Sequence, residues 1–174
     1  MTLSYKPLAL FAVLGLGACS PALDWREFTP PGSGIGVSFP CRPDRQNRAV
    51  TLAQTRVTME MLTCSAGDAT FALAYADLTD PARINTALAE LRVAAIGNLG
   101  GGVPARAPLQ IKGMTSSDEA GRIALAGRLP DGTSVHEHAA FFTRGLRVYQ
   151  ATVIGVDPPV AAVDTFMAGL KFQN

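Results

Sequence analysis

The hydrophobic period of the chain changes along its length, and this change restricts the folds open to the chain more than any other feature. Between residues 34 and 79, apolar side chains alternate with polar or small ones, a pattern typical of β-strands. From residue 80 to 102 they recur at helical spacing, and after residue 120 the alternation returns. Strands and helices therefore share one chain, which predicts the α+β class.

The segments with alternating side chains predict antiparallel hairpins. Before the first helix they are GIGVSFP (34–40), RAVTLAQT, RVTMEMLTC and TFALAYADL, and after it GRIALAGRL, TSVHEHAAFF and LRVYQATVIG. Asp131-Gly132 and Arg144-Gly145 supply turns between the later strands. In TFALAYADL the large residues share one face and alanines line the other, so we expect both faces of this strand to be covered.

Two segments predict helices. Asp80 is the expected N-cap of the first helix, and Pro81 occupies its first position. Its apolar stripe consists of Ile84, Ala87, Leu88, Leu91, Ala95 and Leu99, and the glycines at 100–102 end it. The second helix is expected to begin at Asp157-Pro158 and to carry Val163, Phe166, Met167 and Leu170, with LKF closing the chain.

The N-terminal segment has the features of an export signal. The apolar run at 8–17 is far shorter than the roughly 20 residues that a membrane-spanning helix needs. Leu16-Gly17-Ala18-Cys19 resembles the lipobox of bacterial lipoproteins, in which the cysteine is lipidated after cleavage just before it. We therefore predict a lipoprotein signal peptide at 1–18, a lipidated tether at 19–24 and a single globular domain at 25–174. The alternative is an ordinary signal peptide.

Lipidation of Cys19 predicts a protein held in the cell envelope. One acyl chain binds a membrane reversibly, whereas the three chains of a mature lipoprotein anchor it. Ser20 follows the cysteine, and the aspartate that favours retention in the inner membrane of Gram-negative bacteria is not at this position. We expect the domain to face the periplasm from the outer membrane rather than from the inner membrane.

The two remaining cysteines, Cys41 and Cys64, are candidates for a disulfide, which an exported compartment permits. On a strand, side chains an even number of residues apart face the same side of the sheet, so Cys41 should face the same side as the apolar residues before it. By the same rule of strand parity, Cys64 should face the side opposite to Val57 and Met59. If both apolar sets face one core, a bulge or the end of the strand must reorient Cys64. Two buried free thiols and a two-cysteine metal site are the alternatives.

Charge argues against a nucleic-acid partner. Cleavage after residue 18 of the 174 leaves 156 residues, which suits one domain. Lys6 is the one charged side chain removed, so the 15 basic residues fall to 14 and equal the 14 acidic residues. A domain with equal numbers of acidic and basic side chains has no net electrostatic field that would attract a polyanion such as a nucleic acid.

The order of elements resembles a known fold. The segments GIGVSFPCRP, TFALAYADL, GLRVYQATVIG and AAVDTFMAGLKF are similar to those of the PsbP-like fold, which includes the extrinsic PsbP subunit of photosystem II and Ran-binding nuclear import factors. The resemblance covers about residues 25–172. It implies a mostly antiparallel central sheet with helices packed on its faces, an α/β/α sandwich, and relatives that bind or help to assemble larger complexes. None of their metal-binding or Ran-binding residues corresponds to a position here.

Two groups of residues are candidates for chemistry. His136 and His138 lie two apart on a predicted strand and project from the same face, so they could supply two imidazole ligands to a metal. Arg42, Arg45 and Arg48 make a small basic loop that could bind an anion. A solvated strand face and a solvated hairpin connection are the plainer interpretations of these two patterns.

No catalytic arrangement is evident in the sequence. It has no G-x-S-x-G motif, and its only histidines share one strand. We therefore expect no enzyme activity and no cofactor, and predict a non-catalytic binding or assembly accessory of the envelope with a protein partner that the sequence does not identify. The alternatives are a lipoprotein that binds or delivers a metal through His136 and His138, and a hydrolase whose site is not visible in the sequence.

Overall fold

The computed structural model describes residues 23–173, and these form two antiparallel sheets and two helices. The predicted signal peptide, Cys19 and Ser20 lie outside the described residues. Leu23 and Asp24, predicted as part of the tether, already belong to the fold, since the amide of Asp24 donates to the carbonyl of Pro40. The α+β class and the largely antiparallel pairing are confirmed.

The larger sheet has six strands in the order β3-β4-β5-β8-β7-β6, and every neighbouring pair is antiparallel. Its strands are β3 (Asp44–Leu52), β4 (Thr55–Ala66), β5 (Ala69–Asp77), β6 (Gly121–Arg128), β7 (Ser134–Arg144) and β8 (Arg147–Gly155). The smaller sheet consists of β1 (Arg26–Phe28), β2 (Ile35–Phe39) and β9 (Lys171–Phe172), in the order β1-β2-β9.

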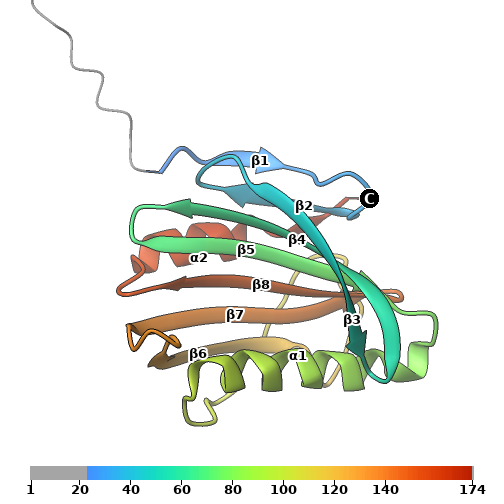
Figure 1. Ribbon diagram of the computed structural model, residues 1–174. Helices are drawn as coiled ribbons and strands as arrows, with labels where there is room; N and C mark the ends of the chain where they lie inside the picture. The colour runs from blue at the N-terminus through green and yellow to red at the C-terminus, as the bar shows by residue number, and fades with distance from the viewer. Residues whose placement is uncertain (1–22, 174) are drawn as a thin grey trace, which may run out of the picture.

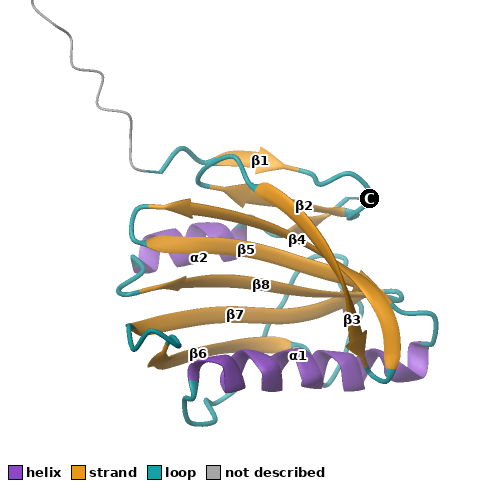
Figure 2. Ribbon diagram, in the orientation of Figure 1, coloured by secondary structure: helices purple, strands orange, loops and turns teal. Residues whose placement is uncertain are grey.

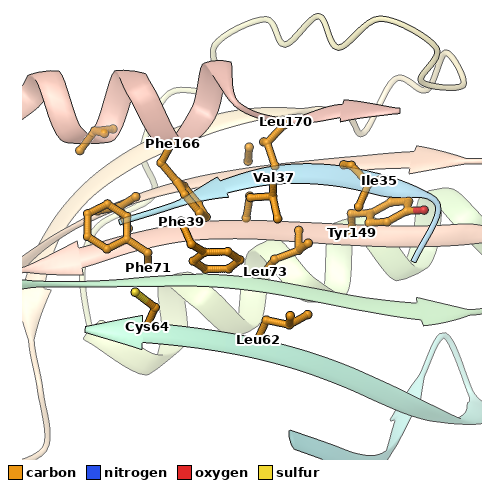
Figure 3. Packing of buried hydrophobic residues seen from close by; sticks show 14 of the residues in the cluster. Ile35, Val37, Phe39, Leu62, Cys64, Phe71, Leu73, Tyr149, Phe166 and Leu170 are labelled. Carbon is orange, nitrogen blue, oxygen red and sulfur yellow. The ribbon is translucent and has the colours of Figure 1, made fainter. Parts of the chain in front are cut away.

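The two faces of the six-stranded sheet are covered by different elements (Figures 1 and 2), and each face carries its own hydrophobic core. One face packs against α1 (Ile84–Leu99), and the other packs against α2 (Val160–Ala168) together with β2. On the α2 side, Phe39, Phe71 and Phe166 meet at the centre of the core (Figure 3). Trp25 contacts the edge of the Phe71 ring there. Both faces of the sheet are thus partly covered.

Strand β4 is buried on both faces, and this explains the parity of Cys64. Leu62 and Cys64 belong to the core on the α2 side, whereas Val57 and Met59 belong to the core on the α1 side. The two apolar sets therefore face different cores, and no bulge is needed to orient Cys64. A disulfide joins Cys41 to Cys64, with a Cα–Cα distance of 5.9 Å.

Local signals in the sequence determine α1. The carboxylate of Asp80 accepts a hydrogen bond from the amide of Ala82 (2.9 Å), and a 3₁₀ turn, η1 (Pro81–Arg83), leads into the helix. Gly100 ends it in the left-handed conformation, with φ of 59°. The six predicted stripe residues are the buried residues of α1: Ile84, Ala87, Leu88, Leu91, Ala95 and Leu99.

Two predicted boundaries are wrong. Helix α2 begins at Val160 rather than at Asp157-Pro158, because the second proline, Pro159, disfavours helical geometry at Pro158. Strand β3 begins at Asp44, so Arg45 and Arg48 lie on a strand and only Arg42 remains in a loop. Within residues 23–173, neither helix is long and apolar enough to cross a bilayer.

The C-terminal end of α1 contacts β6, and this contact requires glycine at position 127. A Cβ atom on Gly127 would lie 2.4 Å from the carbonyl oxygen of Leu99. We therefore expect Gly127→Ala to lower the free energy of unfolding by about 1–3 kcal/mol. Gly97 lies within α1, and a Cβ atom there would have no neighbour from another element within 4 Å. Gly97→Ala is therefore the control and should raise stability by about 0.5–1 kcal/mol. Urea unfolding measures both. Equal effects of the two substitutions would contradict this packing.

Candidate functional site

A groove of about 440 Å³ lies on the α1 side of the six-stranded sheet. It forms because α1 packs mainly on β6, β7 and β8, which leaves part of β4 and β5 uncovered on this face. Its lining residues are Arg48, Val50, Thr51, Leu52, Met59, Met61, Ala72, Ala74, Glu90, Leu91, Ala94, Ala95, Asn98, Gln150 and Thr152. A volume of this size fits a small-molecule ligand.

The floor of the groove consists of side chains in register across three strands. Met61 of β4 lies opposite Ala74 of β5, which in turn lies opposite Gln150 of β8. Alanine leaves space that a larger residue would fill, and the unbranched methionine side chain adapts to what it contacts. Both faces of β5 are expected to be covered, but at Ala72 and Ala74 its alanine face lines this groove.

The two walls of the groove are α1 and β3, and they are tied together at one end. Figure 1 shows β3 crossing toward α1, and the turn after β3 contacts this helix. The amide of Ala53 donates to the Glu90 carboxylate (2.6 Å), and the Arg83 guanidinium donates to the carbonyl of Ala53 (2.5 Å). These two bonds close this end of the groove.

The turn that carries these bonds has unfavourable backbone geometry. Ala53 and Gln54 have φ angles of 47° and 60°, in the left-handed region where side chains other than those of glycine and asparagine are disfavoured. Such a conformation costs on the order of 1 kcal/mol per residue and persists when its surroundings hold it. The contacts of Ala53 with Glu90 and Arg83 provide that support.

The three arginines predicted as one anion-binding group lie apart. Arg48 lines the groove. Arg45 forms an ion pair with Glu60 (2.8 Å), which lies opposite Asn47 on the other face of the sheet. Arg42, in the loop before β3, lies with Asp24 at another surface hollow. The arginines therefore do not converge on one anion, and Arg48 alone reaches the groove.

The two histidines project from the same face of β7, as their spacing predicts. This face is the α2 side of the sheet. His136 is exposed, and the half-buried His138 lines a second cleft of about 350 Å³ together with Arg122 and Asp164. Burial lowers the pKa of His138, the neighbouring His136 lowers it further, and Asp164 opposes this shift. No group of three or more His, Cys, Asp or Glu side chains suited to a metal occurs among residues 23–173.

Glu137 lies between the histidines but points toward the opposite face. It is 5% exposed, and its neighbours across the strands are Leu125 and Ile154. Loss of hydration raises the pKa of this carboxyl to about 7. Strand parity predicts its direction from the sequence, but its burial depends on α1 and could not be predicted that way.

Comparison with known proteins does not assign a family or a ligand to the groove. No family model matches the chain, and a search of the curated proteins finds no similar sequence. The properties of the groove therefore rest on its own residues.

The buried carboxyl of Glu137 predicts a pH-dependent stability. Its pKa is about 7 in the folded protein against an ordinary value of 4.5. Below pH 4.5 both states hold the proton and no cost arises, whereas above pH 7 the folded state buries a charge. Glu137→Gln should thus stabilise the protein by on the order of 3 kcal/mol above pH 7, and this gain should vanish below pH 4.5.

Chemical denaturation between pH 4 and 8 measures this gain. The control is Asp68→Asn, at an exposed turn residue, which should change stability little at any of these pH values. A gain from Glu137→Gln that does not vary with pH would show that the folded state does not bury the charge.

Proposed function

We propose that this chain is a lipid-anchored, periplasm-facing protein of the bacterial cell envelope, with a PsbP-like fold, that binds a ligand or partner without catalysing a reaction. The lipobox-like residues Leu16 to Cys19 support the anchor. Ser20 supports the outer membrane. The disulfide between Cys41 and Cys64 is consistent with an oxidising compartment. The antiparallel sheet with helices on its faces is the arrangement that the resemblance implies.

The groove beside α1 is the observation that carries the proposed binding role. Its floor is mainly apolar, and the polar side chains Asn98, Gln150 and Thr152 are neutral. Its one carboxylate, Glu90, already accepts a hydrogen bond from the turn at Ala53. Such a lining suits the burial of an apolar group and offers no paired acid and base for catalysis.

The anchor is tested by the mass of the protein extracted from membranes. We expect a chain that begins at Cys19 and carries acyl groups, because cleavage and acylation at this residue follow from the lipobox. Alkylation of Cys41 and Cys64 should occur only after reduction, since they form a disulfide. A mass without acyl groups would contradict the anchor and leave the groove unaffected.

The groove is tested with the neutral fluorescent probe N-phenyl-1-naphthylamine, which binds apolar clefts. Ala94 is exposed on α1 and lines the groove, so Ala94→Phe should fill space there without disturbing the core. We expect it to weaken binding of the probe by about tenfold. Val93→Phe is the matched control, because Val93 is 66% exposed and does not line the groove. Equal binding by both variants would exclude the groove as the binding surface.

A further inference from the structure

A small hollow adjoins the groove and is lined by polar groups. It has a volume of about 40 Å³ and is lined by Gln46, Asn47, Arg48, Met59 and Met61. Three of these residues, Arg48, Met59 and Met61, also line the groove, so the two spaces are neighbours on this face of the sheet. The side-chain amide of Gln46 and the guanidinium of Arg48 lie on the same face of β3 and are hydrogen-bond donors, while the methionines lead into the apolar floor. We call this hollow the Arg48 niche.

The charge of Arg48 is available to a ligand. Among the described residues, no ion pair includes Arg48, whereas Arg45 on the same strand is paired with Glu60. Glu90, the acidic residue of the groove, accepts a hydrogen bond from the amide of Ala53, which lies five residues after Arg48 in the chain. Glu90 is not among the residues that line the Arg48 niche. The Arg48 niche therefore favours an anion.

The shape of the combined space indicates the rest of the ligand. From β3 to β8 the groove crosses three strand spacings of about 4.8 Å, or about 14 Å in total. An extended alkyl chain of about a dozen carbons has this length. The floor offers it Met59, Met61, Ala72 and Ala74, and α1 adds Leu91 and Ala95.

We infer that the groove binds a fatty-acid-type amphiphile, with its carboxylate in the Arg48 niche and its alkyl chain across the methionine and alanine floor beneath α1. This inference rests on the proposed function, because it names the ligand class of the same groove. A carboxylate fits because guanidinium groups pair with it through two parallel hydrogen bonds. One guanidinium balances one negative charge, and a volume of about 40 Å³ suits a small head group.

The test compares three twelve-carbon amphiphiles that differ in their head groups: dodecanoate, dodecanol and dodecyltrimethylammonium. Each displaces N-phenyl-1-naphthylamine from the protein at concentrations below micelle formation. The protein is exported with an ordinary cleavable signal in place of residues 1–19, which keeps every element of the described fold and avoids detergent. Circular dichroism checks the folding of each variant.

Dodecanoate is expected to bind about tenfold or more tightly than dodecanol, because the charged pair adds to the burial of the same chain. Arg48→Gln should abolish this preference and leave the affinity for dodecanol within about twofold of its original value. Arg45→Gln is the matched control, since it removes an arginine from the same strand outside the groove, and it should keep the preference for dodecanoate.

Equal affinities for dodecanoate and dodecanol, tighter binding of the cationic amphiphile, or equal effects of Arg48→Gln and Arg45→Gln would each overturn the inference. The proposed binding role would survive these results as long as Ala94→Phe still weakens binding of the neutral probe. If Ala94→Phe has no effect on that probe, the proposed role and the inference both fail. The two failures are therefore distinguishable.

Discussion

The six-stranded sheet presents apolar side chains on both faces, and the rest of the structure depends on covering them. Strands β4, β5, β7 and β8 contribute residues to both cores, so each face needs its own covering layer. The chain supplies α1 for one face, and α2 with the small sheet for the other. Each layer is narrower than the sheet, so each face keeps an uncovered part, and two clefts, the groove and the one lined by His138, form there.

The groove also depends on one contact between segments that are distant in the sequence. The turn after β3 adopts a disfavoured conformation and is held on α1 by Glu90 and Arg83. Without this contact the wall formed by β3 would lose its attachment to the helix. The backbone strain at Ala53 and Gln54 thus accompanies a fixed position of the β3 wall. Strained backbone in proteins occurs at binding sites of this kind.

Helix α1 was predictable from the sequence because its signals are local, whereas the start of α2 was placed too early. The Asp80 cap, Pro81 and the apolar stripe of α1 all lie within one segment, and the stripe matches the buried residues of the helix. The groove was not predictable in this way. It combines residues of β3, β4, β5, β8 and α1, and their proximity follows from strand register and from the position of the helix.

The alternation of side chains along a strand shows what can and what cannot be predicted from the sequence. It correctly placed His136 and His138 on one face and Glu137 on the other. It left the orientation of Cys64 open, because parity gives the face of a side chain but not the number of cores that the sheet faces. The arginines illustrate the same limit, since a basic segment interpreted as a loop is a strand that sends Arg45 and Arg48 to opposite faces.

The balance of charge in the predicted mature chain determines how the proposed binding would gain its affinity and its selectivity. With 14 acidic residues against 14 basic ones after removal of Lys6, no long-range field draws in a charged ligand. Affinity must come from apolar burial in the groove, which salt does not screen. Selectivity must come from a charge at short range, and Arg48 is the cationic side chain that lines the groove. An alkyl chain with one anionic head group meets both conditions, whereas a small, highly charged ligand meets neither.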